Sequence, residues 1–343
     1  MAMDKKRIGI VLGDVAGVGP EIVVKVIDKN RNDIKNNLVI VGDYDLFESI
    51  IMKSNVDLEI RVIEDKDEIL NSDEKILFYD LKTLHNQDYR IGEPSAVCGK
   101  AVITELMEVI DLARNNVVSG LFYAPLNKYS MNKAGFNHFS EKGLFEEFLK
   151  SSDNAYEINI LNNIWTNRVT SHIPFRDIAR TLSKDNIFNA ISALNGILKD
   201  TFKNGYKIYV AGLNPHAGES GTLGSEENGV IIPAIMKAQD DGMDVEGPFS
   251  ADTIFVKAKK EEICGVVTMY HDQGQIAMKL MGFENGVTYQ AGFSIPIVTP
   301  AHGTAFDIAG KGCANENSAA TALKCLCAMV PQECSVAIPN AHV

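Results

Sequence analysis

The sequence lacks several patterns that mark secreted or membrane-bound proteins. Its six cysteines form no Cys-x-x-Cys pair and no regular framework, which favours reduced, mostly structural thiols in a reducing compartment. No apolar run reaches the length of a membrane span. Only five apolar residues follow Lys5-Lys6-Arg7, too few for a secretory signal. We therefore expect a cytoplasmic protein that does not contact a membrane.

An excess of positive charge is also missing. The formal net charge is -12, and no stripe of Lys and Arg interleaved with aromatic residues offsets it. Such a field repels phosphate backbones, so nucleic acid is not an expected partner. For the same reason, an anionic substrate would need local cations or a metal ion in its site.

Two compact motifs that identify a site directly are absent. The chain contains neither the Gly-x-Gly-x-x-Gly fingerprint of dinucleotide-binding proteins nor a His-x-x-x-His metal motif. Residues 13–20 and 302–315 are nevertheless rich in glycine and other small residues. Glycines let a dinucleotide approach the backbone and expose amide donors, although each segment also fits a simple tight turn.

The composition is that of a soluble globular protein, and the length fits two domains or one large α/β unit. The 343 residues are 45% hydrophobic and 23% charged, and they exceed the size of an ordinary single core. Strand-like runs alternate with helical patterns, which predicts largely parallel sheets. The runs lie at 7–12, 38–41, 75–78 and 120–123, and the helical patterns lie at 20–28, 96–115 and 184–200, the last capped by Ser183. We expect a first domain from residues 1–130 plus 265–343 and a second from residues 131–264.

Short polar or glycine-rich motifs follow six of the apolar runs. They begin at Gly13, Ala124, Ser171, Asn214, His271 and Ala301, and four of them carry a histidine. In open α/β sheets, ligands bind outside the carboxyl ends of the strands. One histidine in a loop is unremarkable, but the repetition predicts a common site and an enzyme.

Three of these histidines are candidate metal ligands. His172, His216 and His271 are far apart in the chain, so only the fold can bring them together. Three imidazoles leave coordination positions open for substrate, as a catalytic metal requires. Nearby side chains that could fix the imidazole tautomers are Asp177, Asn214, Glu219 and Asp272. The alternative is three unrelated loop histidines.

Six motifs in order resemble the 4-hydroxythreonine-4-phosphate dehydrogenase family over nearly the whole chain. They are GDVAGVGPE at 13–21, APLNK at 124–128, SHIP at 171–174, GLNPHAGE at 212–219, ADT at 251–253 and YHDQG at 270–274. The segment 302–315 is also similar to the nucleotide-binding stretch of the isocitrate and isopropylmalate dehydrogenases, which share the broader fold.

The resemblance implies an isocitrate/isopropylmalate dehydrogenase-like fold with two α/β/α domains, an interdomain cleft and a homodimer. It implies one divalent metal ion (Zn, Mg, Mn or Co) held by three histidines, the third of which can come from the partner subunit. Matched by motif, these are His172, His216 and His271. It also implies NAD, or NADP, bound by residues His302, Gly303, Thr304, Asp307 and Asn315.

The implied reaction is the oxidation of a secondary alcohol in a small hydroxy acid. The metal would lower the pKa of the hydroxyl so that hydride leaves to the nicotinamide. If a carboxylate lies β to the resulting ketone, decarboxylation follows and the metal stabilises the enolate. Asp252 and Lys279 are candidates for proton handling and substrate orientation, although each could instead belong to a surface ion pair.

The predicted substrate pocket departs from the family. The candidates are Glu141, Lys142, Thr288 and Lys279. Glu141-Lys142 replaces a His-Thr pair, Thr288 replaces an Asn and Ile297 replaces an Arg, whereas Lys279 is retained. Glu141 would repel a phosphate, and the chain has no arginine after Arg180 to supply paired donors.

Three other functions therefore stay open. The same chemistry could act on a non-phosphorylated hydroxy acid or a cis-diol. An acyl- or phosphotransferase of related fold would not use NAD, and its three histidines would be superfluous. A metal-binding or regulatory module that has lost catalysis would bind metal without turnover.

Overall fold

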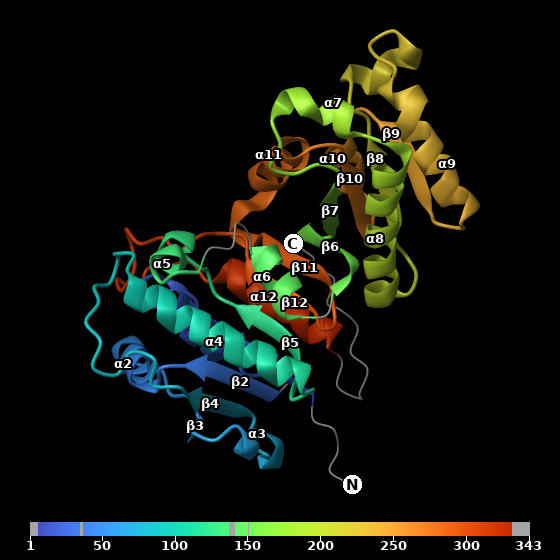
Figure 1. Cartoon of the computed structure of the whole chain (residues 1–343). Helices are drawn as coiled ribbons and strands as arrows, with labels where there is room; N and C mark the ends of the chain where they lie inside the picture. The colour runs from blue at the N-terminus through green and yellow to red at the C-terminus, as the bar shows by residue number, and fades with distance from the viewer. Residues whose placement is uncertain (1–5, 35–36, 137–140, 150, 331–343) are drawn as a thin grey trace. The chain divides into compact units, whose positions relative to one another are not determined.

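The chain forms two compact units (Figure 1). The computed structural model describes residues 6–34, 37–136, 141–149 and 151–330. Unit 1 comprises Met1–Ala155 and Val287–Pro339, and unit 2 comprises mainly Tyr156–Gly286. Both are α/β, which confirms the predicted fold class. No helix within the described ranges is both long enough and apolar enough to cross a bilayer.

These boundaries differ from the predicted ones at 130/131 and 264/265. The segment after residue 130 stays with unit 1, where Phe145 packs against Tyr123 and Phe293. The strand at 264–268 belongs to unit 2 because both of its neighbours in the sheet lie there. As a consequence, His271 shares a unit with His172 and His216.

Unit 1 is a mostly parallel sheet between two layers of helices. Its strands, in spatial order, are β3 (Arg61–Ile63), β4 (Ile76–Asp80), β2 (Asn37–Gly42), β1 (Arg7–Val11), β5 (Val118–Tyr123), β12 (Ile297–Pro300) and β11 (Val287–Phe293). Only the β11–β12 pair among these is antiparallel. The predicted runs at 7–12, 38–41, 75–78 and 120–123 match β1, β2, β4 and β5 to within about two residues at each end.

The helices of unit 1 cover both faces of this sheet. They are α1 (Gly19–Asn30), α2 (Tyr44–Ser54), α3 (Asp67–Asn71), α4 (Ala96–Arg114), α5 (Lys128–Lys133), α6 (Glu141–Phe148) and α12 (Asn317–Met329). Figure 1 shows α4 lying along the sheet. A Cβ on Gly9 would stand 2.7 Å from Val109 of α4, and a Cβ on Gly120 would stand 2.8 Å from Val330, just beyond α12. Close packing on both faces therefore requires these glycines.

Unit 2 has the same layered plan. Its strands, in spatial order, are β6 (Ser151–Leu161), β7 (Ile164–Arg168), β10 (Cys264–Thr268), β8 (Lys207–Ala211) and β9 (Val245–Phe249). The last four run parallel, whereas β6 and β7 form an antiparallel pair. Its helices are α7 (Ile178–Thr181), α8 (Lys184–Phe202), α9 (Ile232–Asp240), α10 (Ile254–Ala258) and α11 (His271–Gly282).

The predicted cap of the long helix α8 is confirmed. The Ser183 hydroxyl accepts a hydrogen bond from the Asn186 backbone N–H, and the Asn186 side chain accepts one from the Ser183 N–H. This reciprocal pair satisfies two helix-start donors. Leu194 and Leu198 of α8 then pack over Gly265 of β10, which orients that strand in the sheet.

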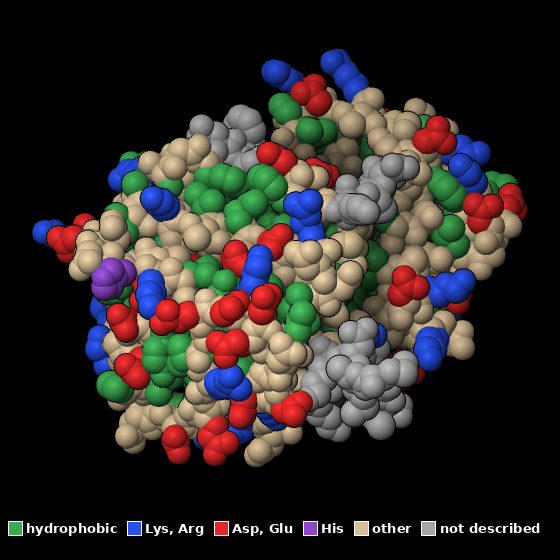
Figure 2. Space-filling model, turned by 60° about the horizontal axis from the view of Figure 1, so that its bottom comes forward, with side chains coloured by type: hydrophobic (Ala, Val, Ile, Leu, Met, Phe, Trp, Pro, Cys, Tyr) green, Lys and Arg blue, Asp and Glu red, His purple; other side chains and the backbone are tan. Residues whose placement is uncertain are grey.

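The distribution of charged side chains and the state of the cysteines match what the composition predicts. On the face drawn in Figure 2, Lys and Arg side chains are interspersed with Asp and Glu. The five cysteines in the described ranges are free thiols, and Cys334 lies outside those ranges. Burial raises the pKa of the Cys264 thiol to about 12, so it stays protonated and unreactive.

Unit 1 encloses two carboxylates that form no ion pair with a cationic side chain in the described part of the chain. Asp14 and Glu105 are both fully buried. Glu105 Oε1 accepts from the Thr83 hydroxyl at 3.0 Å, and Oε2 has no hydrogen-bond partner in the described part of the chain. Burial raises the pKa of Glu105 well above 4.5, and the nearby charges of Asp43 and Asp14 raise it further.

We predict that Glu105→Gln stabilises the protein at pH 8 more than at pH 5. Because the folded-state pKa of Glu105 is raised, its proton favours the folded state at low pH, and stability is lost as pH rises from about 4.5 through the raised pKa. Glutamine removes that loss. Urea unfolding at both pH values measures it, with exposed Glu59→Gln as control. An equal change in the free energy of unfolding of Glu105→Gln at the two pH values would contradict this assignment.

Candidate active site

The parallel strands of unit 2 bring four of the predicted residues to one edge of the sheet. β7, β10, β8 and β9 are neighbours with the same direction, so their carboxyl ends lie together. His172 follows β7, His271 follows β10 and His216 follows β8. Asp252 follows β9. The three candidate metal ligands thus occupy loops on adjacent strands, the arrangement of ligand sites in α/β sheets.

Two of the imidazoles lie side by side. The ring centroids of His172 and His271 are 5.4 Å apart, and both rings line a cavity of about 340 Å³. Asp272 Oδ1 lies 2.7 Å from His271 Nδ1, so the carboxylate accepts the Nδ1–H. This bond orients the ring and leaves Nε2 available for a ligand. The predicted role of Asp272 as a partner of an imidazole therefore has direct geometric support.

Hydrogen bonds lock the three histidine loops to one another. The Thr170 hydroxyl donates to the Met269 carbonyl at 2.8 Å, which joins the loops after β7 and β10. Gln273 Oε1 accepts from the Met269 N–H at 2.7 Å, and its Nε2 donates to the Gly212 carbonyl at 2.8 Å. Gln273 therefore joins the loop after β10 to the loop after β8. The relative positions of the loops depend on these links.

His216 lies in a backbone turn of the wrong hand for L-residues. The φ angles of His216, Ala217, Glu219 and Ser220 are 54°, 52°, 43° and 57°, and that of Gly218 is 78°. A left-handed turn costs non-glycine residues roughly 1–2 kcal/mol each. Such strain persists only where surrounding contacts impose it. The turn therefore needs support from outside its own residues.

The other predicted helpers of the histidines have different contacts. Asn214 Nδ2 donates to Glu226 and Glu227, at 2.8 and 2.9 Å, so these contacts anchor the loop. Glu219 is exposed, and Asp177 lies 3.9 Å from Arg176. Within the described ranges of this single chain, no three His, Cys, Asp or Glu side chains stand close enough to hold a metal ion.

The two predicted catalytic residues lie on separate elements of unit 2. Asp252 is exposed, and its Oδ1 accepts from the Ser250 hydroxyl at 2.6 Å. Lys279 lies on α11, the helix that begins at His271, and it is exposed. Both are accessible to a small molecule.

The remaining substrate candidates lie in unit 1. Glu141 Oε2 accepts from the Tyr123 hydroxyl at 2.6 Å. Thr288 of β11 stands opposite Thr299 of β12, and the side chain of Lys142 lies outside the described residues. Ile297 is fully buried in the apolar core of this unit. Position 297 therefore faces the core of unit 1.

Three motifs of unit 1 also meet at one edge of their sheet. β1, β5 and β12 are parallel neighbours, and the segments 13–21, 124–128 and 301–315 follow them. The Asp14 N–H donates to the Pro125 carbonyl at 2.9 Å, and the Val18 N–H donates to the Thr304 carbonyl at 3.0 Å. The segment thought to bind nucleotide therefore adjoins the glycine-rich loop before α1.

Side chains within this segment hold its own backbone. The Lys311 ammonium donates to the Asp307 carbonyl at 2.7 Å, and Asn315 Oδ1 accepts from the Asn317 N–H at 2.9 Å. Gly303 has open space where a Cβ would be. His302 Nε2 is buried without a hydrogen-bond partner among the described residues. A buried unpaired nitrogen beside an open glycine fits a bound polar ligand.

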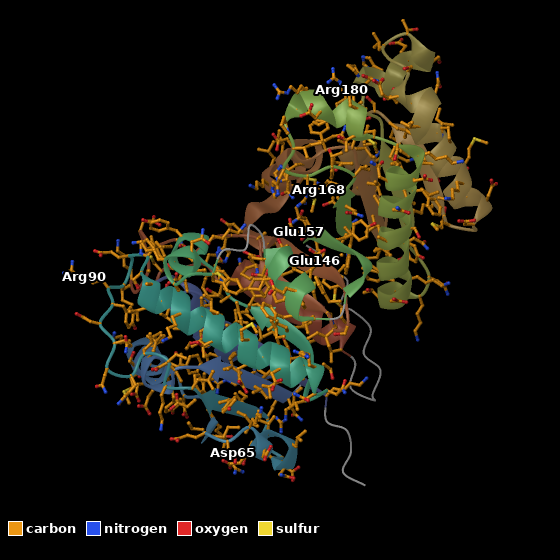
Figure 3. All side chains as sticks on the ribbon, viewed as in Figure 1. Asp65, Arg90, Glu146, Glu157, Arg168 and Arg180 are labelled. Carbon is orange, nitrogen blue, oxygen red and sulfur yellow. The ribbon has the colours of Figure 1, made fainter. Side chains whose placement is uncertain are left out.

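A buried arginine behind the cavity was missing from the sequence-based predictions. Arg168 Nε donates to the hydroxyl of Ser171, a residue that lines the cavity, at 2.9 Å. The same guanidinium donates to Asn159 and forms an ion pair with Glu157, which lies beside it in Figure 3. No local spacing reveals this network, because β6 and β7 bring its members together.

Comparison with known proteins gives one family. A sequence model described as pyridoxal phosphate biosynthetic protein PdxA matches residues 34–326. A protein from Pseudomonas aeruginosa named as a 4-hydroxythreonine-4-phosphate dehydrogenase is 37% identical over 94% of this chain and 96% of its own length. One from Oceanobacillus iheyensis named as a D-threonate 4-phosphate dehydrogenase is 34% identical, over 94% and 97%.

Solved structures are similar over the same length. The crystal structure of 4-hydroxythreonine-4-phosphate dehydrogenase from Klebsiella pneumoniae has a TM-score of 0.81 and 29% identity, covering 95% of this chain and 100% of that one. A terephthalate 1,2-cis-dihydrodiol dehydrogenase from Burkholderia xenovorans has a TM-score of 0.65 and 24% identity, covering 95% and 98%. The second likeness shows a shared fold.

We predict that Gly218→Ala lowers the free energy of unfolding by at least about 1–2 kcal/mol. Its φ is 78°, and a Cβ there would stand 2.6 Å from Glu227 Oε2. Urea denaturation measures the change. The matched control is Gly229→Ala, where no atom lies within 4 Å of the added Cβ. Equal stability of the two variants would show that the left-handed turn does not need glycine.

Proposed function

This chain belongs to the PdxA family of pyridoxal phosphate biosynthetic proteins, and we propose that it is an NAD-dependent, divalent-metal-dependent dehydrogenase of a small phosphorylated hydroxy acid. The predicted family is thereby confirmed, and so is the general activity, a dehydrogenase acting on a hydroxyl group. The observation that carries the finer proposal is the pair of adjacent imidazoles, His172 and His271, at the shared strand edge of unit 2.

The donor chemistry of that edge fits a divalent cation. His172 and His271 would hold it together with a third ligand, His216 or its counterpart in a second copy of this chain, and Asp272 keeps the His271 ring oriented. A bound metal would lower the pKa of the substrate hydroxyl, which favours loss of hydride to a nicotinamide. Asp252, in the loop that follows the neighbouring strand β9, would accept the hydroxyl proton. Lys279 supplies a positive charge for an anionic group of the substrate.

We propose that unit 1 binds the nicotinamide nucleotide. We assign its site to the His302, Gly303, Thr304, Asp307 and Asn315 segment. The unpaired Nε2 of His302 supports this assignment, as does the contact of Thr304 with the loop before α1. Segments of small residues at the start of a helix allow phosphates to approach backbone amides.

The substrate class follows the two relatives, both of which are named for 4-phosphate substrates. We propose a phosphorylated hydroxy acid, oxidised to a ketone and then decarboxylated where a carboxylate lies β to it. Glu141 is held by Tyr123 through a hydrogen bond, which turns its carboxylate toward a protein donor.

We also propose a homodimer that completes the metal site. Ile276 and Leu280 are 59% and 84% exposed and lie one turn apart on α11, the helix that begins at His271. Phe175, which lines the cavity, is 77% exposed. Apolar side chains exposed beside a site are typical of an interface. A second copy of this chain would cover them and could supply a third ligand.

The catalytic proposal predicts nicotinamide reduction that needs both substrate phosphate and metal. We expect turnover with 4-hydroxythreonine 4-phosphate or D-threonate 4-phosphate, and little turnover with the dephosphorylated acids or with a cis-diol. A chelator should abolish the activity, and added divalent metal should restore it. His172→Ala should lower kcat/KM by a hundredfold or more. Loss of a residue that only supports a metal ligand already lowers metal affinity or activity by roughly 10- to 100-fold, and loss of the ligand itself should cost at least as much. Exposed His85→Ala is the control. Turnover that a chelator does not affect would refute the dependence on metal. Full activity of His172→Ala would refute the role of His172 as a metal ligand.

The dimer proposal predicts that Leu280→Glu produces monomers. A charge placed on a buried apolar contact leaves an unpaired ion, which costs the interface several kcal/mol. Sedimentation equilibrium measures the association constant. Met236→Glu on α9, at a side chain 57% exposed, is the control and should associate as the wild type does. A monomeric wild type, or a Leu280→Glu variant that stays dimeric, would exclude this interface.

A further inference from the structure

One buried carboxylate anchors the entrance of the left-handed turn that carries His216. Glu227 is only 2% exposed. Its Oε1 accepts from the N–H groups of Leu213 and Asn214, at 2.8 and 2.7 Å. Its Oε2 accepts from Asn214 Nδ2 at 2.9 Å. All three bonds fall on the residues directly before Pro215 and His216, so they fix where the turn begins.

Two glycines of the same loop make room for this carboxylate. A Cβ on Gly212 would stand 3.2 Å from Glu227 Oε1, and a Cβ on Gly218 would stand 2.6 Å from Oε2. Gly212 precedes the turn, and Gly218 lies at its middle. The carboxylate therefore contacts both the start and the centre of the turn, and it is enclosed by the loop that it supports.

Backbone hydrogen bonds at the two ends of the turn join it to the flanking residues. The Ala217 N–H donates to the Asn214 carbonyl at 3.1 Å, and the Leu223 N–H donates to the Gly218 carbonyl at 3.1 Å. Neither bond uses the N–H group of Leu213 or Asn214, which both donate to Glu227. Without Glu227, the N–H groups of Leu213 and Asn214 would lose their acceptor, and the unfavourable backbone of residues 216–220 would relax toward the right-handed region.

We propose that Glu227 is a positioning residue that holds the left-handed turn and thereby fixes the position of the His216 imidazole. Glu227 does not touch the reacting groups. The proposal rests on the proposed function only for the task given to His216, since the geometry of the turn is a property of the protein without metal. Its closing experiment therefore has a readout that needs neither metal nor turnover.

The first readout is the imidazole resonance of His216 in metal-free protein labelled with ¹³C-histidine, identified by its loss in His216→Ala. We expect a single narrow signal in the wild type and a shifted or broadened one in Glu227→Ala. Glu227→Gln keeps an acceptor for the two backbone N–H groups but places an amide against Asn214 Nδ2, so an intermediate change is expected. This isosteric variant keeps the test valid if the alanine variant unfolds.

The neighbouring Glu226→Gln is the matched control. Glu226 Oε2 also accepts from Asn214 Nδ2, at 2.8 Å, and this bond lowers the pKa of Glu226. In contrast to Glu227, Glu226 is only half-buried, and the N–H groups of Leu213 and Asn214 donate to Glu227 rather than to Glu226. The His216 signal should therefore stay as in the wild type.

The second readout is Co²⁺ affinity, followed by visible absorption. We expect Glu227→Ala to weaken binding by roughly 10- to 100-fold, as loss of a supporting contact does in metal sites. In a His216→Ala background, the same change should have no further effect on Co²⁺ affinity, although any loss of stability would persist. A purely structural role would weaken binding in both backgrounds.

The outcomes separate this inference from the proposed function. An unchanged His216 signal in both Glu227 variants overturns the inference, and so does an equal loss of Co²⁺ affinity with and without His216. A wild type that binds no Co²⁺ overturns the metal site, and the histidine signal alone then decides the role of Glu227.

Discussion

The parallel pairing of strands is the constraint on which both candidate sites depend. In unit 2, the hydrogen bonds of β10 to β7 and β8 place the ends of these strands at one edge, and in unit 1 the pairing of β5 with β1 and β12 does the same. Parallel strands present all their carboxyl ends on the same side. Residues more than forty positions apart in the chain thereby become neighbours.

The edge of unit 2 combines a rigid base with a strained loop. Thr170 and Gln273 tie the loops to the sheet and to one another through backbone groups. The turn at 216–220, in contrast, occupies a region that L-residues avoid. Strain of this kind is found where the position of a functional side chain matters more than local stability. The buried carboxylate of Glu227 is the contact that offsets it.

Local patterns predicted much of the secondary structure. The apolar runs of β1, β2, β4 and β5, and the Ser183 cap of α8, were recognisable because strand and helix signals depend on near neighbours. The antiparallel pairs β6–β7 and β11–β12 were not predicted, since pairing direction is not written in an isolated run. The predicted domain boundaries differed from the units for the same reason, as β10 is placed by its partners.

The sequence by itself determined the family, the α/β class and the identity of the histidines, because motifs and periodicity are properties of short segments. Only the tertiary structure decided that His172 and His271 adjoin, that Arg168 lies behind Ser171, and that position 297 is core. It also revealed Glu227, which no motif had singled out. These facts depend on hydrogen bonds and packing between distant segments, and such contacts exist only after the sheet has set their register.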